Sequence, residues 1–308
     1  MKARYSHIGL AKLCGWFGLT RQAYYQNSWN AIETSLEHEL VVQQVLHIRS
    51  RHPRMGTRKL YELLEPFMLE HQIKMGRDAL FDLLSTHNLL VRRRRRYLKT
   101  THSHHWLRKF PNLIRDVVPT RINQLWVSDI TYWKLNNDRH VYISFITDAY
   151  SHKILGYHVA QTLEAVESLK ALQQALSTIG WDDQPIDLIH HSDRGVQYCS
   201  QPYVSLLQDY GVQISMSDSG DPQQNAIAER VNGILKHEYL YTYEVCSLNQ
   251  ASKLLTQAIE LYNTERPHMS ISNRPPSDVH SSHSTIPVRK LWKNYYHQKR
   301  IIVNPLQD

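Results

Sequence analysis

Three carboxylates separated by long intervals are the residues of this chain best suited to chemistry. Asp129 interrupts an apolar run, Asp193 ends another, and Glu229 lies in a helical pattern with 35 residues between it and Asp193. A buried carboxylate needs a partner or a metal ion. Three such oxygen donors can hold hard divalent cations such as Mg²⁺, which also bind substrate phosphates. Two such ions can activate an attacking oxygen and stabilise the leaving oxygen of a phosphodiester.

Each acid also has a purely structural interpretation, and the residues alone leave both open. Asp129 lies in the run LWVSDITYW, which offers no neighbouring Arg or Lys as a partner, so a functional role is favoured. Asp193 belongs to an SDRG sequence typical of a turn, although α/β sheets bind ligands at the carboxyl ends of their strands. For Glu229 the ordinary explanation is an exposed glutamate, which is the commonest kind.

Helical geometry favours a functional role for Glu229. Its helix carries an apolar stripe formed by Ile227, Val231, Ile234 and Leu235. At 3.6 residues per turn, Glu229 lies roughly 200° around the helix from Ile227 and is predicted to face away from the stripe. The same face is predicted to carry Asn225, Asn232, Gly233 and Lys236. We therefore expect Glu229 to be open to a ligand, with Lys236 two turns on to hold a phosphate.

Other reaction classes lack their usual motifs. The chain contains no Gly-x-x-x-x-Gly-Lys-Ser/Thr loop and no Gly-x-Ser-x-Gly element, so phosphodiester chemistry without a nucleotide cofactor remains. Its cysteines are far apart and form no CxxC pair, which disfavours a disulfide framework or a zinc finger and favours a reduced, cytoplasmic protein. No apolar run approaches the roughly 18 residues of a membrane span, and the N-terminus does not resemble a signal peptide.

The net charge of +8 is unevenly distributed. Residues 1–118 carry 20 Lys and Arg against 9 Asp and Glu, whereas residues 119–285 carry 11 against 18. The tail, residues 286–308, is again basic, with 5 against 1. A basic front and tail around an acidic middle indicate a polyanion-binding protein whose middle binds cations, although a basic protein without a nucleic-acid role remains the alternative.

Several basic residues are candidates for DNA contact. Five consecutive arginines lie where a linker is expected, and their mutual repulsion favours phosphate contact over a merely solvated segment: Arg92, Arg93, Arg94, Arg95 and Arg96. Arg58 and Lys59 lie at the start of a predicted helix, and Arg194 directly follows Asp193. We expect all of them to contact the DNA backbone.

The hydrophobic pattern predicts a helical front and a strand-rich middle. Residues 8–26 are predicted to form two short helices around a Gly turn, with Thr20 capping the second, in a helix-turn-helix arrangement. Residues 36–91 are predicted to form further helices with leucine-rich core faces. From residue 123 the order is βββ-α-β-α-β-α, beginning with a hairpin. This order predicts an α/β domain with a mixed sheet covered by helices.

The motifs together resemble a known family. The segments LWVSDITY, HHSDRGVQY and NAIAERVNGILKHE resemble the DDE motif of the retroviral-integrase superfamily, including its 35-residue second gap. The segments SHIGLAKLCGWFGLTRQAYY, HPRMGTRKLY and YNTERPH resemble insertion-sequence transposases of the two-frame type, specifically their downstream frame, OrfB. The resemblance covers nearly the whole chain.

This resemblance implies an RNase H-like catalytic domain in which Asp129, Asp193 and Glu229 bind Mg²⁺, with Mn²⁺ as a substitute. It implies nicking of double-stranded DNA at the transposon's inverted-repeat ends and attack of the freed 3′-hydroxyl on target DNA. It also implies a homo-oligomer on paired ends, often with the upstream-frame product OrfA. The corresponding domain prediction begins with a helix-turn-helix-like segment (residues 1–34) and a helical DNA-binding domain (residues 35–97). A basic linker (residues 98–118), the integrase catalytic domain (residues 119–285) and a basic tail (residues 286–308) follow.

Two other functions are alternatives to the transposase. A DNA-binding regulator with an inactive catalytic fold is disfavoured because all three acids are present. A ribonuclease of the same fold differs in its substrate and is distinguished by cleavage of RNA or hybrid without DNA strand transfer.

Overall fold

The computed structural model describes residues 8–91, 106–115, 117–136, 139–180, 187–218 and 225–281. The chain divides into two compact units, the first formed by residues 1–51 and 55–91 and the second by residues 52–54 and 92–308. The five consecutive arginines, residues 92–96, and the predicted basic tail, residues 286–308, lie outside the described residues.

The first unit is helical. Its helices are α1 Leu10–Trp16, α2 Arg21–Arg51, α3 Thr57–Glu70 and α4 Arg77–Thr86. The second half of α2 packs with α3 and α4 around a core that includes Val41, Val45, Leu60, Leu64, Leu80 and Leu84. The predicted leucine faces of the later helices are therefore confirmed at these positions.

The long helix α2 corrects one prediction. Thr20 caps it as expected, because its Oγ1 accepts a hydrogen bond from the Ala23 amide at 3.0 Å. The helix does not stop near residue 26, however, but continues to Arg51. No glycine or proline lies within it to end the helix early. The predicted boundary between residues 34 and 35 therefore falls inside one helix, and the division into domains stays a prediction.

The second unit is built on a five-stranded mixed sheet with strand order β3-β2-β1-β4-β5. The strands are β1 Leu125–Lys134, β2 His140–Asp148, β3 Ile154–Ala160, β4 Ile189–Ser192 and β5 Gln213–Met216. The first three form an antiparallel meander, while β4 and β5 lie parallel to β1. The predicted hairpin and the order of strands and helices are confirmed.

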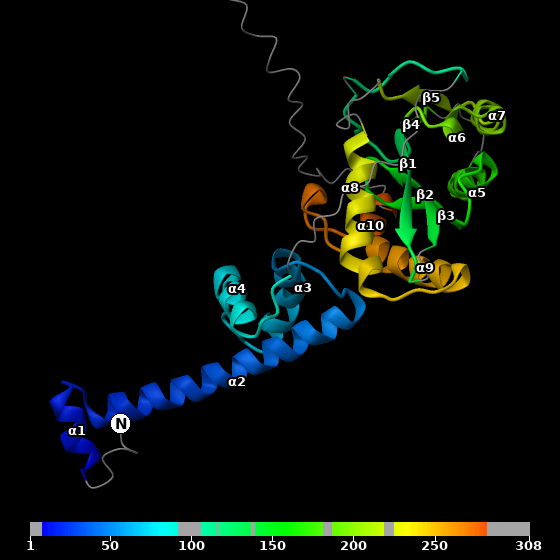
Figure 1. Cartoon of the computed structure of the whole chain (residues 1–308). Helices are drawn as coiled ribbons and strands as arrows, with labels where there is room; N and C mark the ends of the chain where they lie inside the picture. The colour runs from blue at the N-terminus through cyan, green and yellow to red at the C-terminus, as the bar shows by residue number, and fades with distance from the viewer. Residues whose placement is uncertain are drawn as a thin grey trace, which may run out of the picture. The chain divides into compact units, whose positions relative to one another are not determined.

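Helices cover both faces of this sheet, as Figure 1 shows. On one face lie α5 Ala165–Leu176, α6 Val196–Cys199 and α7 Gln201–Asp209, around a core that includes Trp126, Ile146, Leu172 and Leu207. On the other face lie α8 Ala226–Ile234 and α9 Leu248–Thr264, around Trp133, Phe145, Val231 and Tyr262. Successive strand residues alternate between the two cores, as the period of a strand requires.

A π-helical turn, Leu235–Tyr239, extends α8 and is tied to the segment after α9, where α10 Pro276–Ser281 also lies. The tie is Arg266, whose fully buried guanidinium donates to both carboxylate oxygens of Glu238 at 2.8 Å. A two-bond pair of this kind fixes direction as well as distance. The turn that carries Lys236 is thereby held in place.

In the described part of the chain, no helix has the length and apolar character needed to cross a membrane.

Candidate active site

Two of the three acids lie at the same level on neighbouring strands. β1 and β4 are parallel, with Val127 opposite His191. Asp129 lies two residues after Val127 within β1, and Asp193 lies two residues after His191, directly after the end of β4. Both side chains are half-buried. The parallel pairing of β1 with β4 therefore brings these two carboxylates together, at the strand end where ligands bind in α/β sheets.

The backbone after β4 fits closely around Asp193. Its Oδ1 accepts a hydrogen bond from the Gly195 amide at 2.9 Å. A Cβ atom at Gly195 would lie 3.0 Å from the same oxygen and 3.2 Å from Oε1 of Gln197. A side chain at this position would thus press on the carboxylate, which explains the glycine after Asp193 and Arg194 in physical terms.

Asp129 carries the strongest electrostatic signal of the site. The pKa of its carboxyl is raised to about 7, mainly by burial and to a smaller degree by the charges of Asp193 and Glu229. Two hydrogen bonds act in the opposite direction, from the Ile130 amide at 2.9 Å and from Nδ2 of Asn232 at 2.6 Å. Both other acids therefore interact with the carboxylate of Asp129, and they concentrate negative charge there.

Glu229 lies on α8 and is exposed, whereas the stripe of Ile227, Val231, Ile234 and Leu235 is buried. The prediction that it faces away from the stripe is confirmed. Partial desolvation raises the pKa of its carboxyl above the usual value.

The two asparagines of this helix do not share that open face, contrary to the prediction. Asn225 and Asn232 are both buried. Nδ2 of Asn225 donates to the carbonyl of Ser128 at 2.9 Å, and Nδ2 of Asn232 donates to Asp129. Residues seven apart lie on one side of a helix, so this pair pins α8 against β1. The spacing of the two asparagines in the sequence indicates that they share one side of the helix. Only the fold shows that this side faces β1.

Lys236 lies in the π-helical turn with its ammonium 4.3 Å from the centre of the Tyr132 ring. The pKa of this amine is lowered to about 8, because the effect of burial exceeds the opposing effect of the charge of Asp129. Lys236 therefore lies within the electrostatic field of the acidic site, as its predicted position two turns after Glu229 requires.

The other described residues that are predicted to contact DNA are Arg194, Arg58 and Lys59. Nη2 of Arg194 is 3.6 Å from Asp218, a carboxylate that Arg115 also binds at 2.6 Å. Arg194 is thus engaged within its own domain. Arg58 is exposed and Lys59 half-buried in the first turn of α3, in the first unit. For all of these residues, DNA contact stays a prediction.

The donor chemistry of the acidic site fits a hard divalent cation. The described residues contain no preformed group of three or more His, Cys, Asp or Glu side chains arranged to hold a metal ion. The donors that do meet here are carboxylate oxygens, and burial together with the charges of the other two acids raises the pKa of Asp129. Oδ1 of Asn232, buried beside Asp129, has no hydrogen-bond partner among the described residues. Excess negative charge and oxygen-only donors are what Mg²⁺ and Mn²⁺ require.

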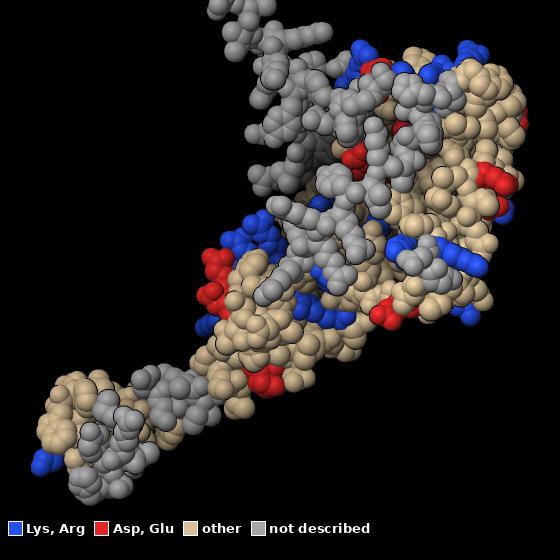
Figure 2. Space-filling view, viewed as in Figure 1, with Lys and Arg blue, Asp and Glu red and all other residues tan. Residues whose placement is uncertain are grey.

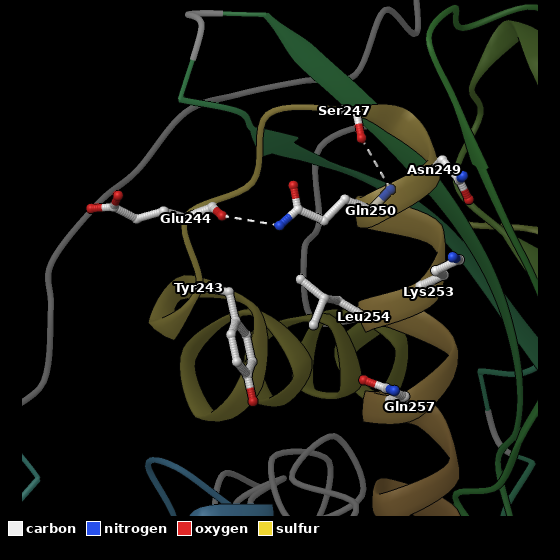
Figure 3. Close-up of a pocket in the computed structure, with 8 residues that line it drawn as sticks. All are labelled: Tyr243, Glu244, Ser247, Asn249, Gln250, Lys253, Leu254 and Gln257. Carbon is white, nitrogen blue, oxygen red and sulfur yellow. Dashed lines mark hydrogen bonds between the residues drawn. The ribbon is translucent and has the colours of Figure 1, made fainter.

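The structure also has a surface pocket that is separate from the acidic site. It has a volume of about 460 Å³ beside the start of α9, and Figure 3 shows its lining from Tyr243 to Gln257. None of the three acids is part of that lining. Gln250 closes one side by donating to the carbonyl of Glu244. On the face drawn in Figure 2, Lys and Arg side chains lie in small groups between Asp and Glu side chains and larger neutral areas.

Comparison with known proteins identifies the domain around these acids. Residues 119–222 and 210–276 each match a model of the integrase core domain. The chain is 34% identical over 270 residues to the 31 kDa protein of insertion element IS600 from Shigella sonnei, covering 86% of this chain and 96% of that protein. It is 29% identical to the transposase of insertion sequence element IS629 from Shigella sonnei, over 75% of each chain.

Among solved structures, the catalytic core domain of HTLV-2 integrase in complex with magnesium is similar, with 20% identity and a TM-score of 0.42 over 52% of this chain and 97% of that one. The matched core domain and the mixed sheet confirm the predicted RNase H-like class. Members of this superfamily are polynucleotidyl transferases that act on DNA. The chain therefore belongs to the insertion-sequence transposases of the DDE, or retroviral-integrase, superfamily.

Proposed function

We propose that Asp129, Asp193 and Glu229 are the catalytic residues of this transposase and hold divalent metal ions, Mg²⁺ or in its place Mn²⁺. The observation that carries the assignment is the interaction of both other acids with Asp129, whose pKa reaches about 7. When bound, the ions supply charge neutralisation and polarise phosphate oxygens. The pairing of β1 with β4 supports this proposal by aligning Asp129 with Asp193, and Asn232 on the helix of Glu229 holds the carboxylate of Asp129.

The proposed reaction has two balanced steps. In the first, a water oxygen attacks a phosphorus atom at the element end, the bond from phosphorus to the 3′-oxygen breaks, and a 3′-hydroxyl and a 5′-phosphate result. In the second, that 3′-hydroxyl attacks a phosphorus atom of target DNA, and the displaced 3′-oxygen leaves as a new hydroxyl. The number of phosphodiester bonds is conserved in the second step, so no nucleotide cofactor is needed.

The substrates and partners follow from this proposal. The enzyme would take the inverted-repeat ends of its element and a target duplex, as an oligomer of this chain on paired ends and with OrfA as a further partner. Its proposed location is the cytoplasm. Lys236 and Arg58, Lys59 and Arg92–Arg96 would bind phosphates, which positions DNA without specifying sequence. Arg194 is a weaker candidate, because it already meets Asp218.

The test is nicking and strand transfer on duplexes that carry the element ends, with Mg²⁺ or Mn²⁺. Asp129→Asn, Asp193→Asn and Glu229→Gln are each expected to abolish both steps while DNA binding persists. Full activity in any one of them contradicts the assignment of that residue. An RNA and hybrid panel run in parallel separates the transposase from a ribonuclease, since cleavage of those substrates without strand transfer supports the latter.

A further inference from the structure

The contact between Tyr132 and Lys236 joins two elements of the acidic site. Tyr132 is the eighth residue of β1, and Lys236 belongs to the π-helical turn after α8. The ammonium lies 4.3 Å from the centre of the phenol ring, well within the roughly 6 Å reach of a cation–π contact. Both side chains are half-buried, a setting in which such a contact is stronger than at an exposed site.

The arrangement of the strands explains how the ring reaches this position. Side chains alternate along β1, so Tyr132, three residues after Asp129, starts from the opposite face of the sheet. β4 pairs with β1 only over Leu125–Val127, so beyond this pairing β4 does not cover the edge of β1. A large side chain at that edge can meet a residue from the α8 side without crossing the sheet. The ammonium of Lys236 reaches the Tyr132 ring from the turn that follows α8.

The helix side of the contact is held independently. Glu238, two residues after Lys236, receives two hydrogen bonds from the buried Arg266. The backbone under Lys236 is therefore fixed, but its four-carbon side chain is not fixed by that anchor. An unrestrained ammonium in the field of Asp129 would move toward the carboxylates. Within the described residues, its recorded contact is with the Tyr132 ring rather than an ion pair with an acid.

We propose that Tyr132 is a positioning residue that holds the ammonium of Lys236 beside the acids and presents it to a DNA phosphate. The ring keeps the cation near the site and away from the carboxylates that the metal ions need. The ligand of the pair is thus a non-bridging oxygen of a phosphodiester. This inference rests on the proposed function, because it takes DNA as the substrate of the acidic site.

The test is a double-mutant cycle read by DNA binding. Wild type, Tyr132→Leu, Lys236→Gln and the double variant are titrated with an element-end duplex at several salt concentrations, without metal. Tyr132→Leu is expected to weaken binding about fivefold. It should also reduce the slope of log affinity against log salt by about 0.9, as Lys236→Gln does, since one phosphate contact is lost. In the Lys236→Gln background, Tyr132→Leu should have no further effect, and independent effects of the two changes would overturn the proposal.

Tyr132→Phe is the matched control, because it keeps the ring and removes only the hydroxyl. It is expected to retain the affinity and salt slope of wild type, and a loss equal to that of Tyr132→Leu would overturn the role of the ring.

A second measurement does not depend on the folding of Tyr132→Leu. Lysines are methylated with ¹³C-formaldehyde, and the Lys236 signal is identified by its absence in Lys236→Gln. In wild type and Tyr132→Phe this signal is expected upfield of the other lysines because of the ring current, and a signal at the ordinary position would overturn the contact.

Failure of this inference can be told apart from failure of the proposed function. Nicking with Mg²⁺ is measured on the same preparations. If wild type nicks and the cycle is additive, the inference is wrong and the function stands. If wild type does not nick, the function is wrong, while the cycle still reports whether Tyr132 acts through Lys236.

Discussion

The side-chain amide of Asn232 donates a hydrogen bond of 2.6 Å to the carboxylate of Asp129. This bond joins the helix that carries Glu229 to the strand that carries Asp129. This bond favours the ionised form of the acid and sets the distance between the two elements. One buried amide therefore affects both the protonation of Asp129 and, together with Asn225, the placement of α8 against β1.

Replacing Asn232 by Ala is expected to raise the pKa of Asp129 further, because a hydrogen bond that lowers it is lost. The acid limb of the nicking pH profile should then move to higher pH, with a loss of about tenfold at pH 7. Asn225→Ala is the matched control, since that buried amide binds the Ser128 carbonyl instead of an acid. An identical shift of the profile in both variants would assign the effect to helix packing.

Asp129→Asn is expected to stabilise the metal-free protein at neutral pH. The folded pKa of Asp129, about 7, lies above the unfolded value, so the folded state binds more protons between these two values. The stability of wild type therefore falls as pH rises from about 4 to about 7, whereas that of the variant lacks this component. We expect a difference of about 1–3 kcal/mol at pH 7.5 and little at pH 3.5, measured by urea unfolding. A difference independent of pH would contradict this origin, and Mg²⁺ should narrow the gap by stabilising wild type alone.

Gly195→Ala is expected to reduce nicking by more than tenfold with a smaller effect on stability. The added Cβ would lie 3.0 Å from Oδ1 of Asp193, so this carboxylate must shift. A displacement of this size at a catalytic group is costly because orientation is lost. Gly233→Ala in α8 serves as the control, since no described residue outside the helix's own backbone lies within 4 Å of its added Cβ and a helical alanine should stabilise by about 0.5–1 kcal/mol. Wild-type nicking by Gly195→Ala would show that Asp193 tolerates movement.

Changing Arg92–Arg96 to Gln is expected to weaken DNA binding equally for element ends and unrelated duplexes. Each lost phosphate contact should flatten the salt dependence by about 0.9 in slope. Affinity measured from 50 to 300 mM salt checks this expectation. A variant with the salt slope of wild type would show that these arginines do not bind phosphates.

Local patterns in the sequence predicted most of the catalytic fold. The order of strands and helices and the buried stripe on α8 follow from hydrophobic periodicity, and the exposure of Glu229 follows from its angle on the helix. The identity of the acids came from their spacing and from the resemblance to a family. The continuous helix α2 was missed because residues 27–35 have no clear apolar stripe that would predict a helix through them.

The missed features of the site all depend on contacts between distant segments. The alignment of Asp193 with Asp129 depends on the register between β1 and β4. In that register Val127 lies opposite His191, a residue 64 positions later in the chain. The burial of Asn225 and Asn232 depends on which strand lies under α8. The pairing of Arg194 with Asp218 likewise joins segments that periodicity treats as separate. Such pairings are not encoded in any short window of sequence.

The pair of Glu238 and Arg266 sets a limit on how the catalytic domain can be shortened. A fragment that ends at Glu265 would contain all three acids, yet it would leave the carboxylate of Glu238 without its bidentate partner. Loss of one member of a buried pair costs about 3–5 kcal/mol, a large fraction of the stability of a domain. The smallest fragment worth expressing therefore extends past His268, whose ring contacts the same guanidinium. Residues far beyond the last acid are thus part of the minimal folding unit.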